Sequence, residues 1–212
     1  MPRPLERWPL ILLLLCALAT VGSRLGARDP ATWWMEALPV IAGMVVLPLT
    51  WRRFPLTPLL ACLLFVHALI LLLGAHYTYA EVPAGFWVRD WLGLERNHYD
   101  RLGHFAQGFV PAVLAREILI RKGAVNGRGW LFLYVLALCM AFSALYEMIE
   151  WWAAEALGED AMAFVGSQGD VWDAQWDMFL ATLGALAAQL LLARRHDRQL
   201  NTLRPSGAAQ GL

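Results

Sequence analysis

Acidic residues and a histidine recur at helical spacing in the second half of the sequence. Residues three or four positions apart lie on the same face of an α-helix, so a set spaced in this way presents its side chains together. Three sets follow the pattern: Asp100, His104 and Gln107; Ser143, Glu147 and Glu150; and Asp170, Asp173 and Asp177. Carboxylates combined with an imidazole are suited to hold a divalent metal ion or to transfer protons.

The six carboxylates of these sets cannot all remain ionised at close range without compensation. One solution is a divalent cation, and an oxygen-rich set with one imidazole suits magnesium, manganese, calcium or zinc. A second is protonation of some carboxylates in a proton relay, and a third is pairing with Arg89, Arg96 or Arg101 in a structural network. For the first solution we predict metal ligands at His104, Asp100, Glu147, Glu150, Asp173 and Asp177, with catalytic roles for His104, Glu147 and Asp173.

The composition indicates that these residues belong to a membrane protein. Of the 212 residues, 59% are hydrophobic and only 16% are charged, against about 45–50% and about 25% in soluble domains. A chain of this size cannot bury so much apolar side chain and still present a polar surface to water, so we expect membrane lipids around it. The 17 basic residues form no stripe, and the sequence therefore gives no support for nucleic-acid binding.

Apolar runs of about 17–25 residues predict membrane-spanning helices, because backbone polar groups in lipid must be satisfied within their own segment. Six runs are present: Trp8–Ser23, Trp33–Thr50, Thr57–Ala75, Leu102–Ile120, Trp130–Ala154 and Trp172–Ala193. The first also resembles a cleavable signal peptide, whose removal would leave five. The predicted fold is all-α: a polytopic transmembrane helical bundle that forms one domain over residues 1–195. Residues 196–212 predict a disordered cytoplasmic tail.

Basic residues predict how this bundle is oriented. With six spans, 12 of the 17 Lys and Arg residues fall at the two termini or in every second loop. The positive-inside rule then gives a multi-pass protein of the bacterial inner membrane with both termini in the cytoplasm. In this topology the three polar sets share the external level of the membrane. We expect them to face each other, since a charged aspartate at the bilayer centre costs about 2.5–3.5 kcal/mol.

Three longer motifs surround the polar sets. They are Asn-His-Tyr-Asp-Arg-Leu-Gly-His-Phe-Ala-Gln-Gly-Phe over residues 97–109, Tyr146-Glu147-x-x-Glu150-Trp151, and Gly169-Asp170-x-x-Asp173-x-x-x-Asp177-Met178. Together they resemble the YjdF-like family of bacterial inner membrane proteins, and the resemblance covers most of the chain. It supports a membrane protein and implies no particular biochemical activity.

A looser similarity links the chain to the VanZ-like family, which is associated with resistance to glycopeptide antibiotics. Asp100-Arg101-x-x-His104-Phe105 is similar to the Asp-Lys-x-x-His-Phe motif of that family. Glu150 stands where the family has glutamine, and Asp177 where it has asparagine. Both departures add a carboxylate, which favours a metal or proton role and argues against transferring the resistance function.

Three classes of function fit these observations. The first is a membrane-embedded enzyme that uses a divalent metal ion and acts on a lipid or envelope precursor at the external leaflet. The second is a structural or accessory membrane protein whose polar cluster only ties helices together. The third is a proton- or ion-coupled transporter, against which stand the lack of an internal repeat and the thinning of polar residues toward the cytoplasmic half.

Overall fold

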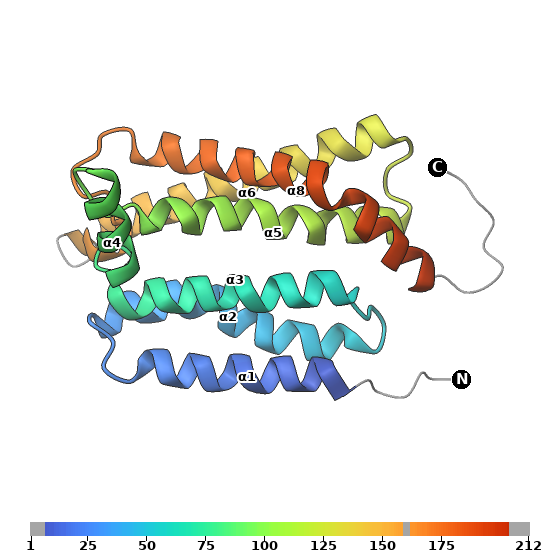
Figure 1. The fold of residues 1–212 in the computed structure, drawn as a ribbon, viewed down its shortest axis with the longest axis horizontal. Helices are drawn as coiled ribbons and strands as arrows, with labels where there is room; N and C mark the ends of the chain where they lie inside the picture. Colours follow the sequence, from blue (N-terminus) through green and yellow to red (C-terminus); the bar gives the residue numbers. More distant parts are fainter. Residues whose placement is uncertain (1–6, 159–161, 204–212) are drawn as a thin grey trace. The chain divides into compact units, whose positions relative to one another are not determined.

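The computed structural model describes residues 7–158 and 162–203, which form α-helices and their connections (Figure 1). Along the chain these helices are α1 (Arg7–Arg24), α2 (Pro30–Trp51), α3 (Pro58–Tyr77), α4 (Pro83–Leu92), α5 (Tyr99–Lys122), α6 (Arg128–Leu157), α7 (Met162–Val165) and α8 (Asp173–Leu203). No β-strand occurs in the described ranges. The all-α prediction is confirmed, and each predicted span coincides with one helix to within three residues at its start.

Four of the helices, α2, α3, α6 and α8, are long and apolar enough to cross a membrane. The apolar part of α1, Trp8–Arg24, is shorter. Helix α5 has 24 residues, about 36 Å at 1.5 Å per residue, which suffices for a hydrocarbon core of about 30 Å. It carries more polar side chains than α2, α3 or α6, and several of them belong to the clusters described below.

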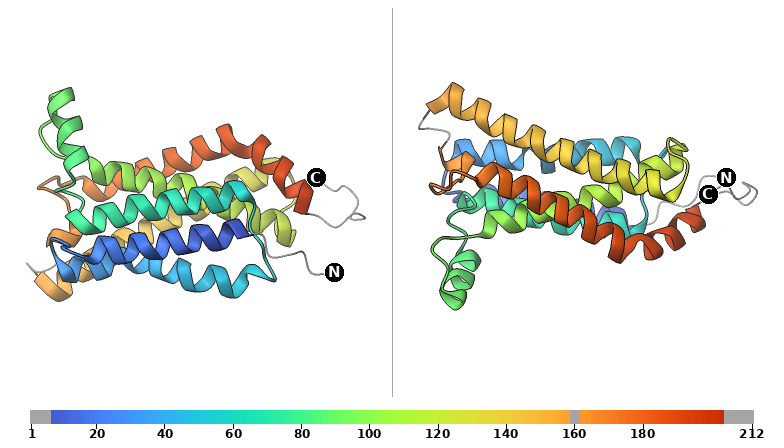
Figure 2. Two further views of the ribbon diagram at one scale, coloured as in Figure 1. Left: turned by 60° about the horizontal axis from the view of Figure 1, so that its bottom comes forward. Right: turned by 90° about the horizontal axis from the view of Figure 1, so that it is seen from above.

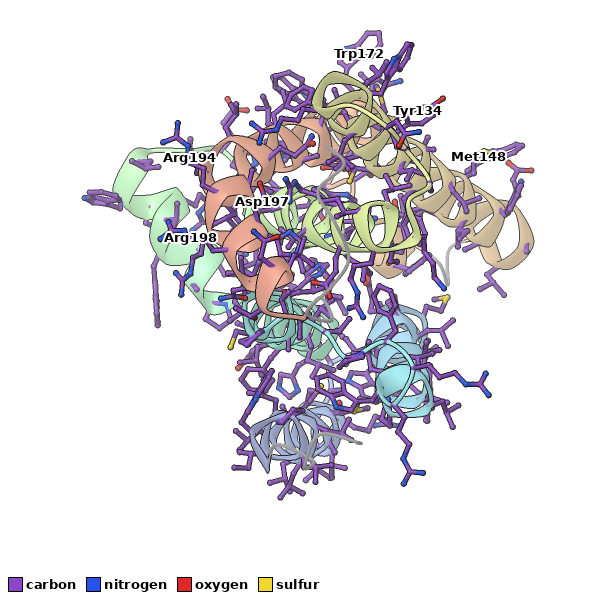
Figure 3. All side chains as sticks on the ribbon, turned by 90° about the vertical axis from the view of Figure 1, so that its right-hand side faces the viewer. Tyr134, Met148, Trp172, Arg194, Asp197 and Arg198 are labelled. Atoms are coloured by element: carbon purple, nitrogen blue, oxygen red, sulfur yellow. The ribbon has the colours of Figure 1, made fainter. Side chains whose placement is uncertain are left out.

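Large apolar side chains cover the outer surface of α6 and α8. Tyr134, Met148 and Trp172 point away from the helices (Figure 3), and Leu190 and Leu191 are 75% and 73% exposed. A surface of this kind is unfavourable in water and is expected where lipid chains surround a protein.

The helices form two compact units, and the single domain over residues 1–195 stays a prediction. The first contains α1, α2, most of α3, α4 and residues 153–169, and the second contains residues 57–60, α5 from Arg101, α6 as far as Trp152, and α8. In the first unit α1, α2 and α3 lie side by side (Figures 1 and 2). They share a buried core that includes Cys16, Trp33 and Leu72.

Two glycines allow α5 and α8 to approach closely in the second unit. A methyl group on Gly108 would collide with the backbone carbonyl of Ala181, and one on Gly184 would collide with the backbone carbonyl of Phe105. Small residues that let helix backbones touch are a common way to pack spanning helices, because lipid supplies no hydrophobic force between them. This contact fixes the register in which the polar side chains of α5 and α8 meet.

The structure departs from the sequence prediction at two places. Helix α4 lies in a stretch that was expected to be a loop. Helix α8 continues to Leu203, so residues 196–203 of the predicted disordered tail are helical, with His196 and Leu200 only 1% and 3% exposed. In this part of α8, His196 Nε2 lies 3.0 Å from the buried carboxylate of Glu117 on α5, which explains why the helix continues. Residues 204–212 of that prediction lie outside the described residues.

We predict that Gly108→Ala and Gly184→Ala each lower the melting temperature of the detergent-solubilised protein by about 2–12 °C, the range expected for overpacking of about 1–3 kcal/mol. Tryptophan fluorescence during a thermal ramp measures this. Gly43→Ala is the matched control, because Gly43 is also inside a helix and a methyl group there meets no atom within 4 Å. Its melting temperature should stay equal or rise, since alanine favours helix by about 1 kcal/mol. Equal behaviour of all three variants would contradict the close α5–α8 contact.

Candidate functional site

The predicted polar sets lie at matching ends of α5, α6 and α8. His104 is in the second turn of α5, Glu147 lies towards the end of α6, and Asp173 and Asp177 lie in the first two turns of α8. Because α6 runs opposite to α5 and α8 (Figures 1 and 2), the end of α6 meets the starts of the other two. Asp100 lies one turn before His104, and α5 itself therefore fixes their relative position.

The His104 ring lies between carboxylates from two other helices. Its Nδ1 is 3.8 Å from Oε1 of Glu147, and its Nε2 is 3.8 Å from Oδ2 of Asp177. The ring is buried, at 6% exposed, and Asp177 is 1% exposed. The Tyr146 ring approaches the imidazole edge-on, with 6.3 Å between ring centroids. The imidazole therefore has a defined orientation, with each nitrogen directed at a different carboxylate.

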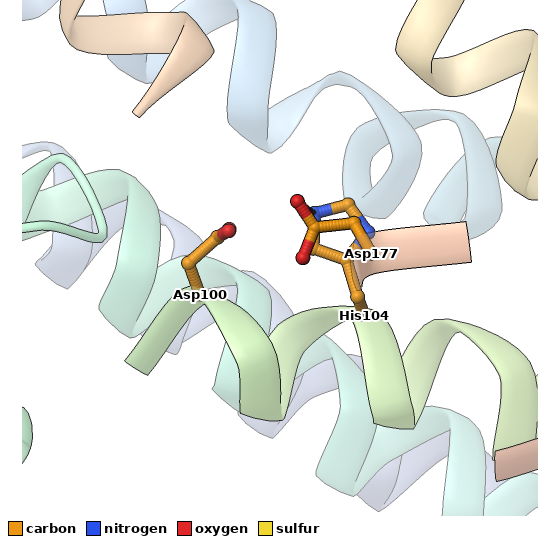
Figure 4. A group of neighbouring side chains, drawn as sticks. All are labelled: Asp100, His104 and Asp177. Atoms are coloured by element: carbon orange, nitrogen blue, oxygen red, sulfur yellow. Dashed lines mark ion pairs between the residues drawn. The ribbon is translucent and has the colours of Figure 1, made fainter. Parts of the chain in front are cut away.

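Three of the predicted ligands, the ring of His104 among them, come together in the structure. One potential ligand atom each from Asp100, His104 and Asp177 lies within 4.8 Å of the other two (Figure 4). His104 and Asp177 are buried, whereas Asp100 is partly exposed. Nitrogen and oxygen atoms bound about 2.0–2.2 Å from one metal ion lie roughly 3–4 Å apart. Side-chain movements of up to about one ångström would therefore bring the three atoms onto one cation.

The electrostatics at the His104 ring call for a compensating proton or cation. A neutral imidazole carries one N–H. If Nδ1 carries it and points it toward Glu147, the lone pair of Nε2 points toward Asp177. A lone pair facing a carboxylate is repulsive, and a distance of 3.8 Å is too long for a hydrogen bond. A second proton on the ring, a proton on the carboxylate or a bound cation removes the repulsion. The geometry is compatible with the metal and the proton solutions alike.

Arginine pairing, the third solution, applies to a different pair of carboxylates. Nη2 of Arg101 lies 2.9 Å from Oδ2 of Asp170 and 3.6 Å from Oδ1 of Asp173. The same guanidinium lies 5.2 Å from the centre of the Trp176 ring. Asp170 also accepts a hydrogen bond from the backbone N–H of Trp172, at 2.9 Å, next to the start of α8. Arg101 therefore offsets part of the negative charge at this end of the second unit.

The other two arginines considered for this pairing each have a partner in the first unit. Arg89 pairs with its neighbour Asp90, at 2.6 Å, and Arg96 donates to the backbone carbonyl of Ser167.

The remaining predicted ligands, Glu147, Glu150 and Asp173, are not part of the group of three. Glu147 lies on the Nδ1 side of the ring, and Asp173 lies beside Arg101. Glu150, one turn beyond Glu147 on α6, is buried at 9% exposed. Their roles as ligands, and the catalytic roles of His104, Glu147 and Asp173, stay predictions.

A second buried polar cluster, missed from the sequence, lies at the other end of α5 and α8. Glu117 is 0% exposed. Its carboxylate accepts hydrogen bonds from the Thr57 hydroxyl at 2.7 Å and the Thr57 backbone N–H at 3.2 Å. It also accepts from Arg121 at 2.9 Å, and His196 Nε2 lies 3.0 Å away. This cluster joins the residues before α3 to α5 and α8 within the second unit.

The neighbours of His196 determine where its ring carries a proton. Nδ1 faces Nη1 of Arg116 at 3.3 Å, and a guanidinium can only donate. Nδ1 is therefore the acceptor, and the ring proton lies on Nε2, which donates to Glu117. Arg116 also pairs with Asp197, at 2.7 Å. The whole cluster is a connected set of donors and acceptors.

A sequence signal for this second cluster does exist. Leu192, His196, Leu200 and Leu203 follow helical spacing beyond the last predicted span, which indicates that the buried face of α8 continues into the stretch predicted to be disordered. No local pattern, however, links His196 to Glu117, 79 residues earlier.

Comparisons with known proteins agree with the membrane prediction. The chain matches the family described as "Predicted membrane protein (DUF2238)" over residues 8–198. It is similar to the inner membrane protein YjdF of Escherichia coli (strain K12), with 54% identity over 195 residues that cover 91% of this chain and 93% of the relative. No solved structure matches it. The resemblance to the YjdF-like family is confirmed, and the looser similarity to the VanZ-like family stays a prediction.

We predict that Glu117→Gln lowers the free energy of unfolding by about 3 kcal/mol, because it leaves the arginine and histidine of a buried network without their charged acceptor. The corresponding fall in melting temperature is about 6–12 °C. Glu155→Gln makes the same chemical change at an exposed position and should change stability by no more than about 0.5 kcal/mol. Thermal unfolding in one detergent compares the two, and a Glu117→Gln protein as stable as the control would show that the network contributes little.

Proposed function

Because this chain belongs to the DUF2238 family of membrane proteins, we propose that it acts inside the bacterial inner membrane, where Asp100, His104 and Asp177 hold a divalent metal ion. The observation that carries the proposal is the convergence of these three ligand atoms within 4.8 Å of one another. Two of the three side chains are buried, and buried charges in proteins are normally paired or bound to metal.

Glu147 is a positioning residue in this proposal. Metal-bound histidines commonly donate their second N–H to a carboxylate, which fixes the ring and makes it a better ligand. With Glu147 on the Nδ1 side at 3.8 Å, Nε2 remains for the metal. One imidazole with two carboxylates favours zinc or manganese over calcium, which prefers oxygen ligands alone.

The substrate class that suits this site is a lipid or an envelope precursor. The side chain of Asp100 is partly exposed, so the group of three is open on one side. A bound divalent ion could activate water or neutralise the charge of a phosphate group. With a metal on His104, acid–base catalysis would fall to Asp173 beside Arg101; without a metal, His104 and Glu147 would form the acid–base pair.

The second buried cluster gives a transporter new support as the alternative function. Sparse polar residues in the cytoplasmic half argued against conduction, yet Glu117 and His196 are buried there. Helices α5 and α8 thus carry a histidine–carboxylate pair at each end. A proton-coupled protein would use the same residues without a metal, and so would a purely structural protein. Metal content therefore separates the enzyme from both alternatives.

We predict that the purified protein holds about one divalent ion per chain, measured by elemental mass spectrometry after dialysis. His104→Gln and Asp177→Asn should lose it, and Glu147→Gln should bind it about 10–100-fold more weakly, the usual effect of removing a ligand's supporting carboxylate. Asp90→Asn is the control, because Asp90 is exposed and pairs with Arg89. A wild-type protein with no more metal than the His104→Gln variant, even after incubation with zinc or manganese, rules out the metal proposal.

We also propose that both termini lie in the cytoplasm, which the distribution of 12 of the 17 basic residues supports. A green fluorescent protein fused at the C-terminus should then fluoresce, and alkaline phosphatase fused there should be inactive. Alkaline phosphatase fused after Gly93, in the connection between α3 and α5, should be active. The reverse pattern would place the group of three on the cytoplasmic side.

A further inference from the structure

Helix α4 presents an apolar face that the first unit leaves uncovered. Trp87 and Trp91 are 73% and 82% exposed, and Val88 and Leu92 are 46% and 56% exposed. At 100° per residue these four side chains share one side of the helix. Asp90 lies on the opposite side and is exposed as well. A ten-residue helix is too short to cross a bilayer, so this apolar face needs another explanation.

The orientation of α4 is fixed by its contact with Asn97. A methyl group on Gly85 would collide with the Asn97 side chain. The amide of Asn97 donates to the Val82 carbonyl at 2.9 Å, and its oxygen accepts from the backbone N–H of Tyr99 at 3.0 Å. Gly85 and Val82 are buried. Because the side of α4 with Gly85 and Val82 contacts Asn97, Trp87 and Trp91 on the other side are left exposed.

The connections of α4 keep it close to the membrane surface. Helix α3, which has the length and composition of a membrane span, ends at Tyr77, and α4 begins at Pro83. The five residues between them reach at most about 17 Å when extended. Beyond α4, the Tyr99 hydroxyl donates to the Ile70 carbonyl of α3, at 3.0 Å, which brings the chain straight back to that helix.

From this position and composition we propose that α4 lies in the headgroup region of the adjacent bilayer leaflet, with Trp87 and Trp91 directed into the lipid. Tryptophan is the residue most enriched at the membrane–water interface, and short helices with one apolar face bind there. Arg89 and Asp90, paired at 2.6 Å, then face water. The inference is independent of the proposed metal site.

Site-directed spin labelling tests this placement. Trp91→Cys and Asp90→Cys are made in the full chain with Cys16, Cys62 and Cys139 changed to alanine. Each is labelled and reconstituted into vesicles of phosphatidylethanolamine and phosphatidylglycerol. The ratio of collisions with oxygen, which concentrates in lipid, to collisions with a water-soluble nickel complex should be several-fold higher at position 91 than at position 90. Equal ratios would overturn the proposal, and so would a label at 91 shielded from both reagents, which would mean that a protein covers this face.

Fluorescence quenching in the protein with its own cysteines gives a second, independent measurement. Lipids brominated near the headgroup should quench a smaller fraction of the emission after Trp87→Phe and Trp91→Phe are combined than in the wild type. Trp33→Phe is the control, because Trp33 is 2% exposed and should not reduce the quenched fraction. An unchanged fraction in the double variant would contradict the lipid contact.

Discussion

Charged groups placed within a bilayer must find compensating charge or hydrogen bonds, because lipid offers neither. The second unit is built around this constraint. At one end of α5 and α8, Glu117 is completely buried and is satisfied by Thr57, Arg121 and His196. At the other end, one arginine and one histidine face a larger number of carboxylates. The Glu117 cluster has a donor for its carboxylate within the protein, whereas around His104 the carboxylates outnumber the arginine and the histidine that face them. That difference makes the His104 site the candidate for binding a cation.

The close packing of α5 on α8 is what brings each cluster together. Gly108 and Gly184 let the two backbones touch, and the helices run in the same direction (Figure 1). His104 therefore meets Asp177 near the start of both helices, and Glu117 meets His196 near their ends. Helix α6 adds Glu147 on the remaining side of the His104 ring. Backbone contact and polar pairing thus support each other along the whole length of α5.

Much of this arrangement could be predicted from the sequence, because hydropathy and charge asymmetry act over whole segments. Hydropathy predicted the spans. Because successive spans cross the membrane in opposite directions, helical spacing then placed Asp100, His104, Glu147 and Asp177 at the same level of the membrane. The choice of partners could not be predicted, since Arg101 pairs with residues 69 or more positions away and nothing local selects Asp170 over Asp100. The extension of α8 was missed because polar residues there suggested disorder, although its apolar face continues through Leu200. Helix α4 was missed because a run of ten residues is too short for a search aimed at spans.

The central claim is that His104 and two carboxylates surround one metal ion, and electron spin echo spectroscopy of the manganese-loaded protein tests it most directly. We expect nitrogen modulation from a single imidazole bound to the manganese, and loss of that modulation in the His104→Gln protein. Manganese that shows only water and carboxylate oxygen around it, or the same nitrogen signal after the histidine is replaced, would contradict the account.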